Sequence, residues 1–142
     1  MDLNYLEDNE VTDLISSNKY FTDRQELLDI QNRITNLIGK IDFTGSVNDN
    51  NFDINYKIKV YRGKRDINRY SIHIRFEDVH HHLVRIDIGS SHNDIKEDPI
   101  HIYNKNCEPR SNNVLPISQS NFPLPSDIID ALDKFLIYNN IH

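Results

Sequence analysis

The sequence predicts an α+β fold, in which a four- to five-stranded mostly antiparallel β-meander carries two N-terminal helices and one C-terminal helix on one face. Apolar residues repeat every three or four positions near both ends of the chain and every second position in the middle. The connections between the alternating segments are short, as in sheets whose neighbouring strands run antiparallel. A chain of 142 residues is long enough to bury its own core, so we expect a single domain over residues 1–142.

Residues 1–45 are predicted to be the helical N-terminal part. A short helix is expected over residues 7–17, with an acidic first turn that suits the helix dipole. A longer helix is expected to begin at Thr22, which can form a capping box with Gln25, and to end near Ile38. Its apolar stripe consists of Leu27, Ile30, Ile34, Leu37, Ile38 and Ile41.

Residues 52–104 are predicted to form the meander, after a polar connection at residues 46–51. Strict alternation of apolar and polar side chains marks strands near residues 52–60, 70–76, 82–88 and 99–103. The third strand is expected to place His82, Val84, Ile86 and Ile88 toward the core and His81, Leu83, Arg85 and Asp87 on the opposite face.

The last part of the chain is predicted to contain a loop and a helix. Residues 104–125 are rich in Asn, Ser and Pro, which indicates a long loop or a broken edge strand around residues 114–117. Ser126 is expected to cap a helix over residues 126–140, whose apolar residues have helical spacing.

The polar alternates of the successive strands are expected to converge on the open face of the sheet. Arginines bind phosphate, histidines move protons near neutral pH, and a carboxylate such as Asp87 orients a histidine. A solvated face with a cross-strand pair of Arg and Asp explains the same residues without any function. The catalytic candidates are His73, Arg75, Arg85, Asp87, His92, His101 and Tyr103, and the candidates for binding nucleic acid or another anion are Lys57, Lys59, Arg75 and Arg85.

Charge is distributed unevenly along the chain, although the formal net charge is −6. Residues 1–54 carry a net charge of −7, residues 55–92 carry +4, and residues 93–142 carry −3. The local field, not the total charge, decides whether an anion is attracted to one face. Nucleic acid therefore stays a candidate partner for the middle segment, and a basic protein surface stays one for the acidic flanks.

Composition also excludes several classes of protein. A single cysteine excludes a disulfide framework, and no apolar run approaches the roughly 18 residues of a membrane helix. The N-terminus lacks the pattern of a signal peptide, so we expect a cytoplasmic location and no membrane partner.

The motifs of most cofactor-binding and metal-binding proteins are absent as well. With four glycines, the chain has no glycine-rich phosphate loop or dinucleotide fingerprint, so no cofactor is predicted. Neighbouring residues of a strand point to opposite faces, so residues 80–82 cannot all ligate one metal ion. No metal site is predicted, and His92, His101 and Cys107 are only weak candidates for one.

Several of these segments resemble a family of small uncharacterised proteins of low-GC Gram-positive bacteria and their phages. The likeness rests on segments 52–59, 83–89, 100–103 and 135–141, with Arg75, His92 and Asn93. A looser, motif-level resemblance to TumE-type toxins of toxin-antitoxin pairs rests on Tyr70, Ser71, His73, Arg85, Asp87 and His92.

Two functions follow as expectations from these resemblances. The first is a phage or mobile-element accessory protein that acts by binding, such as an inhibitor of a host defence system like CRISPR-Cas. The alternative is a toxin with ribonuclease-like activity on the polar sheet face, which would then be a metal-independent enzyme. The expected partner is accordingly a host defence protein or nucleoprotein complex, or RNA, with an antitoxin or a second copy of the chain as further candidates.

Overall fold

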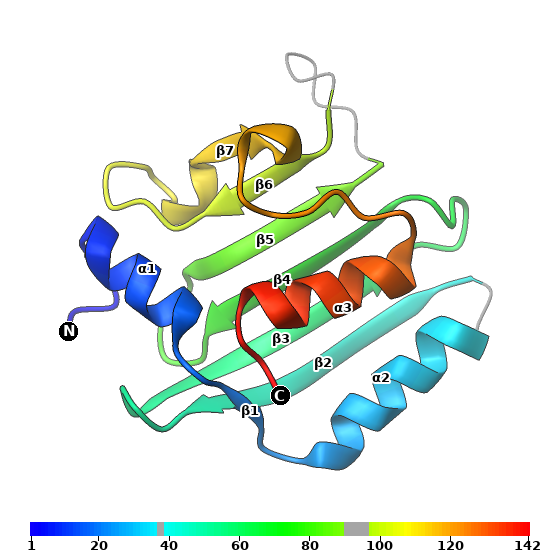
Figure 1. Cartoon of the computed structure of the whole chain (residues 1–142), viewed down its shortest axis with the longest axis horizontal. Helices are drawn as coiled ribbons and strands as arrows, with labels where there is room; N and C mark the ends of the chain where they lie inside the picture. The colour runs from blue at the N-terminus through cyan, green and yellow to red at the C-terminus, as the bar shows by residue number, and fades with distance from the viewer. Residues whose placement is uncertain (37–38, 90–96) are drawn as a thin grey trace.

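Three helices lie on one face of a seven-stranded antiparallel sheet in the computed structural model, which describes residues 1–36, 39–89 and 97–142 (Figure 1). The strands follow one another across the sheet in chain order, so that β1 and β7 form its two edges. The strands are β1 (Tyr20–Phe21), β2 (Ile41–Asp49), β3 (Ile54–Arg62), β4 (Tyr70–Phe76), β5 (His82–Ile88), β6 (Pro99–Ile102) and β7 (Val114–Pro116), and the helices are α1 (Asp8–Ser16), α2 (Arg24–Asn36) and α3 (Ile128–Tyr138).

The α+β class and the antiparallel meander are confirmed, but the predicted number of strands is too low. Two strands are missing from the prediction, the two-residue β1 and the longer β2, whose second half was assigned to a polar connection. Ser46 and Asn48 do carry turn-forming side chains, yet they alternate with the buried Val47 and Asp49. The polar residues of this half-buried strand are of types that are also common in loops. Only their alternation with buried residues therefore identifies β2 as a strand.

The helices occupy the predicted places, with two corrections at their first turns. Thr22 does not cap α2, because its hydroxyl donates to the side chain of Asn48 in β2, while Asp23 accepts a hydrogen bond from the amide of Gln25. Asp127, not Ser126, is the N-cap of α3. Leu37 and Ile38, which belong to the predicted apolar stripe, lie outside the described residues, and Ile41 of that stripe begins β2.

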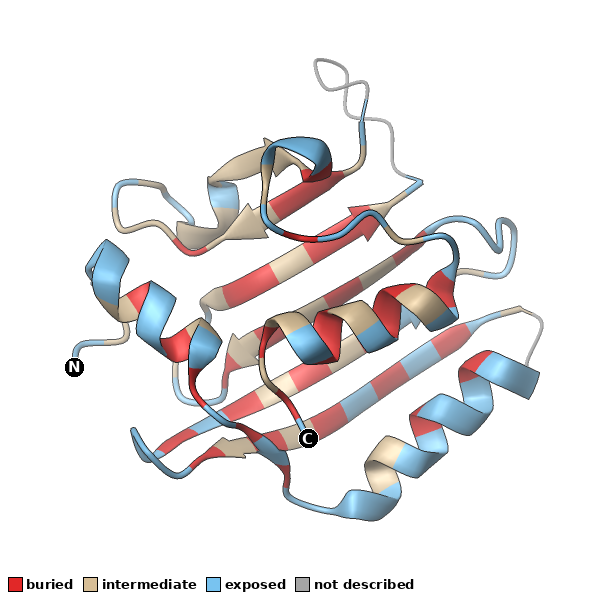
Figure 2. Cartoon of the chain, viewed as in Figure 1, coloured by how far each residue is buried: buried red, intermediate tan, exposed pale blue. Residues whose placement is uncertain are grey.

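Burial alternates along the central strands, as Figure 2 shows by the bands of buried and accessible residues. The buried alternates of β2, β3 and β4 face the helices and form the core with the apolar sides of α1 and α3. The other alternates face away from the helices and remain partly accessible. This second face is called the open face below.

An irregular register between β4 and β5 changes which residues of β5 reach the open face. Ile74 pairs with Val84, but the next pair is Arg75 with His82, so Leu83 is an extra residue in β5. His82 therefore shares the open face with Arg75, and Leu83 is fully buried. The prediction had these two side chains on the opposite faces.

Lys19 joins the two ends of the chain in the core, although a lysine is rarely buried. Its ammonium donates to the carbonyl oxygens of Ile15, Ser17 and Asn139, at 3.1, 2.9 and 2.8 Å. These carbonyls belong to the C-terminal ends of α1 and α3, where cations are favoured. Burial lowers the pKa of Lys19 to about 8, although Asp49 acts in the opposite direction.

Candidate functional site

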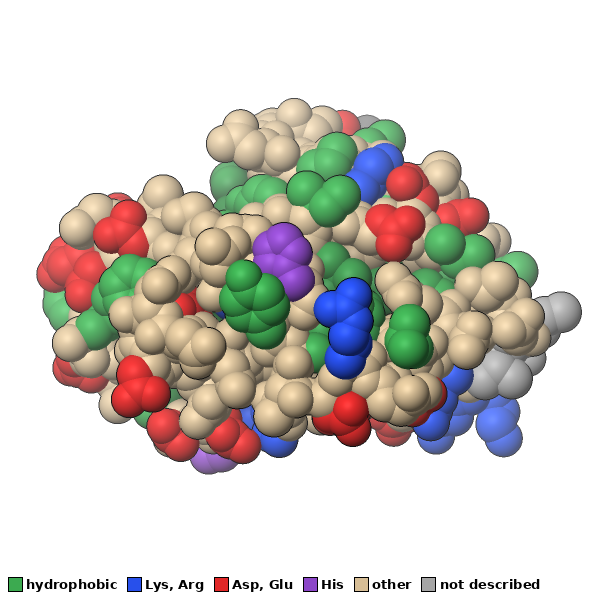
Figure 3. All heavy atoms as spheres, turned by 60° about the horizontal axis from the view of Figure 1, so that its bottom comes forward, with side chains coloured by type: hydrophobic (Ala, Val, Ile, Leu, Met, Phe, Trp, Pro, Cys, Tyr) green, Lys and Arg blue, Asp and Glu red, His purple; other side chains and the backbone are tan. Residues whose placement is uncertain are grey.

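The two faces of the sheet carry opposite charges. The three helices contain seven acidic and three basic residues, whereas the open face of strands β3 to β5 carries the four cations Lys57, Lys59, Arg75 and Arg85 and the single carboxylate Asp87. Figure 3 shows acidic side chains at the end of the molecule where α1 lies and others toward the opposite end. The field of the protein therefore directs anions toward the open face of the sheet.

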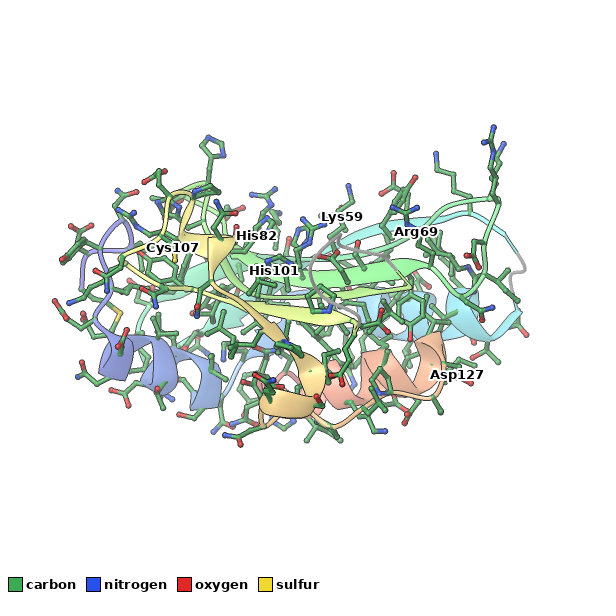
Figure 4. All side chains as sticks on the ribbon, turned by 90° about the horizontal axis from the view of Figure 1, so that it is seen from above. Lys59, Arg69, His82, His101, Cys107 and Asp127 are labelled. Carbon is green, nitrogen blue, oxygen red and sulfur yellow. The ribbon has the colours of Figure 1, made fainter. Side chains whose placement is uncertain are left out.

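Two neighbouring rows of basic side chains cross the open face. Strand pairing aligns Lys57, Arg75 and His82 in one row. The second row consists of Lys59, His73, Arg85 and His101. Figure 4 places Lys59 and His82 on the side of the sheet away from the helices, with Asp127 on the helical side. We call these seven side chains the basic rows.

Arg85, Asp87 and His101 form a connected group within this face. The Nε atom of Arg85 lies 3.0 and 3.1 Å from the two carboxylate oxygens of Asp87, and its Nη2 atom lies 2.9 Å from Oδ1. The Nε2 atom of His101 lies 3.0 Å from Oδ2 of the same carboxylate. Burial opposes the ionisation of Asp87, but the contacts with His101 and Arg85 outweigh it and hold its pKa below the usual value.

The ring of His101 is held from both sides. Its Nδ1 atom lies 2.8 Å from the carbonyl oxygen of Ser111, opposite the contact with Asp87. Each ring nitrogen therefore faces one acceptor oxygen. Because only 13% of the His101 side chain is exposed, this histidine orients Asp87 and Arg85 and has little access to a ligand.

His73 and His82 stack at the centre of the open face, with ring centroids 4.3 Å apart and planes within 13° of parallel. Burial, together with the neighbouring Arg75 and Arg85, lowers the pKa of His73 to about 3 and that of His82 to about 4. The neighbouring His82 also disfavours protonation of His73. The pair is therefore neutral at physiological pH and separates the two arginines without adding charge.

Apart from Arg85, the cations of the basic rows are only weakly neutralised. Lys57 lies 3.4 Å from Glu77 and Lys59 lies 3.6 Å from Asp42, and all four side chains are partly exposed. Such surface pairs contribute about 0–1 kcal/mol and exchange readily for another anion. Arg75 takes part in no salt bridge with the residues that the structure describes, and its Nη1 atom lies 3.4 Å from the carbonyl oxygen of Phe76.

One predicted site residue, Tyr103, does not lie on the open face. It is 2% exposed and belongs to the core, where its hydroxyl donates to the carbonyl of Leu3 and accepts from the amide of Leu6. It follows the end of β6 and pairs with the extra residue Leu83, so the irregular register turns it toward α1. The prediction of a polar, outward Tyr103 is wrong for this reason.

His92, a candidate for both catalysis and metal binding, lies outside the described residues. In the part of the chain that is described, no three His, Cys, Asp or Glu side chains are grouped to hold a metal ion. The ring nitrogens of His101 face Asp87 and Ser111, and Cys107 lies in the loop after β6. The two described candidates for metal binding, His101 and Cys107, therefore do not belong to one group of ligands.

His82 is the residue of the open face that the sequence prediction missed. A signal for it exists, because Leu83 and Val84 are consecutive apolar residues in a strand that otherwise alternates. Two successive core side chains indicate a bulge, which moves the residues before it to the other face.

An α+β protein with a helix-covered core and a basic, uncovered sheet face is the class that these observations define. The chain belongs to a family of unknown function, DUF6978, whose model matches residues 6–141. No curated protein and no solved structure matches the chain. The likenesses to phage proteins and to TumE-type toxins therefore stay predictions. None of the described helices has the length and apolar character needed to cross a membrane.

Proposed function

We propose that this protein acts by binding and that single-stranded RNA is the ligand of its open sheet face. The observation that carries the proposal is the pair of basic rows, which brings two lysines, two arginines and a neutral pair of histidines to one uncovered face. Phosphate contacts from Lys and Arg supply most of the affinity of sequence-independent binding to nucleic acid. An antiparallel sheet also spaces its side chains regularly, so that successive phosphates meet successive strands.

The geometry favours binding over catalysis. Transphosphorylation of RNA needs a base and an acid whose pKa values lie near the working pH. His73 and His82 are too weakly basic for the first role, because their pKa values are lowered to about 3 and about 4. Asp87 and Ser111 engage both nitrogens of His101, and Tyr103 is buried. The toxin-like ribonuclease is therefore the weaker alternative.

Binding is tested with a fluorescently labelled single-stranded RNA of 12 nucleotides, by anisotropy over a series of salt concentrations. Arg75→Ala is expected to weaken binding several-fold and to lower the slope of log K against log salt by about 0.7, the value for one lost phosphate contact on a single strand. Arg33→Ala is the matched control, because Arg33 is an exposed arginine of α2 on the helical side. Both variants remove the same charge from the chain.

Equal losses for the two variants, or the absence of RNA binding by the natural protein at low salt, would contradict the proposal. The same RNA, incubated with the protein and separated by electrophoresis, distinguishes the alternative. Intact RNA agrees with binding. Cleavage that Arg85→Ala abolishes would favour the ribonuclease.

A second candidate partner is a basic protein surface, and the acidic helices favour it. The exposed acids of α1 and α2 include Asp8, Asp13 and Asp29, on the side opposite to the basic rows. A protein with both faces fits a nucleoprotein complex of a host defence system, with RNA on one side and a basic protein surface on the other. Phage plating on CRISPR-immune bacteria tests this role, because expression of the natural protein should restore infection.

A further inference from the structure

A pocket with a volume of about 670 Å³ opens at one end of the open face, beside the hairpin loop that connects β3 and β4. Its lining includes Tyr61, Arg65, Arg69, Ser71 and Arg85. Figure 4 shows Arg69 on the same side of the sheet as Lys59 and His82. Pockets of about 300–1,000 Å³ are typical of sites that bury most of a small ligand.

The shape of the pocket follows from the register of the strands. Tyr61, Ser71 and Asp87 form the row next to the one that contains His73 and Arg85. Ser71 has the smallest side chain of this row and stands between the two larger ones, so the surface dips at β4. The loop of residues 63–69 rises beyond the end of the row and closes one side.

The charge of the pocket suits a phosphate with two negative charges. Lys64, Arg65, Arg69 and Arg85 all contribute to the lining, against the two carboxylates Asp66 and Asp87. The four cations outnumber the two carboxylates. Asp87 holds Arg85 and His101, and Asp66 accepts a hydrogen bond from the amide of Asn68 within the loop.

Arg85 is the oriented cation of this pocket. Three contacts of 2.9–3.1 Å with Asp87 fix its guanidinium, and the side chain is still 38% exposed. A guanidinium that is already held loses less conformational entropy when it binds a phosphate.

The opposite wall of the pocket can take a base. Tyr61 is 40% exposed, and the Nζ atom of Lys59 lies 5.9 Å from its ring centroid. Stacking of a base on an aromatic ring is worth about 1–3 kcal/mol in proteins that bind single strands. Ile88 adds an apolar side chain to the same lining.

We infer that this pocket binds a nucleoside with a phosphomonoester, and that it thereby captures the phosphorylated end of a single-stranded RNA. The inference rests on the proposed function, because the basic rows would hold the remainder of the strand. The phosphomonoester contacts Arg65, Arg69 and Arg85, and the terminal base stacks on Tyr61. Internal phosphates carry one charge and no free end, so the pocket distinguishes ends from internal nucleotides.

The test compares three forms of one 12-nucleotide RNA, with a 5′-phosphate, with a 3′-phosphate, or with hydroxyls at both ends. Free adenosine monophosphate is the fourth probe, measured by calorimetry. One of the phosphorylated RNAs is expected to bind about tenfold more tightly than the hydroxyl form. Arg69→Ala, at an exposed position of the loop, should abolish this difference, whereas Arg75→Ala should weaken all three RNAs equally.

Ser71→Tyr is a second variant, which fills the floor of the pocket and keeps a residue type that strands favour. It should abolish the preference for a phosphorylated end and leave binding of the hydroxyl RNA intact. Equal affinity of the natural protein for all three RNAs would overturn the inference while the proposed function stands. If no RNA binds, the proposed function fails, and binding of free adenosine monophosphate that Arg69→Ala removes would then support the pocket alone. Absence of that binding as well would overturn both.

Discussion

Neutral His73 and His82 at the centre of a basic face predict that acid destabilises the protein through these two residues. In the unfolded chain both imidazoles take up a proton near pH 6.5, whereas in the folded protein their pKa values are lowered to about 3 and about 4. Between these limits the unfolded state binds more protons, so the free energy of unfolding falls as the pH falls below about 6.5. Above that pH both imidazoles are neutral in the folded and in the unfolded state, so this loss of stability is absent.

The magnitude follows from the two shifts. For a drop from pH 7 to pH 4.5, proton linkage gives a loss of about 2.5 kcal/mol in the free energy of unfolding for His73. His82 contributes somewhat less, because solvent screens part of its shift. A charge on His82 disfavours protonation of His73, so the two losses are not fully additive. We therefore expect the pair to lower the free energy of unfolding by about 3 kcal/mol over this pH range.

Urea denaturation at half-unit steps from pH 7 to pH 4.5 measures this loss. The double variant His73→Phe, His82→Phe keeps two stacked rings and removes both titrating groups, so its pH profile should be flatter by about 3 kcal/mol. His80→Phe, at an exposed position outside the stack, is the control and should keep the slope of the natural protein. If the double variant and the natural protein lose stability in parallel, the histidines are not held neutral and the reasoning is refuted.

Three further predictions concern stability and are read from urea denaturation at pH 7. Lys19→Met should cost about 3 kcal/mol, because three buried carbonyl groups lose their donor, and a change below about 1 kcal/mol would show that water replaces the ammonium. Gly89→Ala should cost about 2 kcal/mol or more, because Gly89 has φ +75° and a Cβ atom would lie 2.5 Å from a backbone oxygen. Gly63→Ala is the control: its Cβ atom meets no atom within 4 Å, so stability should change by less than about 0.5 kcal/mol. Ile86→Ala should cost about 2–5 kcal/mol, and Ile137→Ala, at a position that is 79% exposed, should cost less than about 0.5 kcal/mol; similar values for the two would mean that the faces of β5 are misassigned.

Much of the candidate site was predictable from the sequence, because a strand places alternate residues on the same face. The positions of His73, Arg75, Arg85, Asp87 and His101 on the open face follow from that period alone. The contact between Asp87 and a histidine was also expected, since a carboxylate and an imidazole on neighbouring strands come within reach. Alternation cannot predict a shift of register. Here the extra residue Leu83 in β5 places His82 on the open face and Leu83 in the core, the reverse of the prediction.

The sequence by itself determined the class of fold and the order of its helices and of strands β3 to β6, because hydrophobic periodicity is a local property of the chain. It also determined that a basic segment lies between acidic flanks. Only the tertiary structure decided which cations lie together, that Tyr103 is buried, and that Lys19 joins the ends of two helices. It also decided that Ser71 lies beneath a pocket. These features depend on pairing between segments far apart in the chain, and pairing is fixed by packing of the whole core rather than by any local pattern.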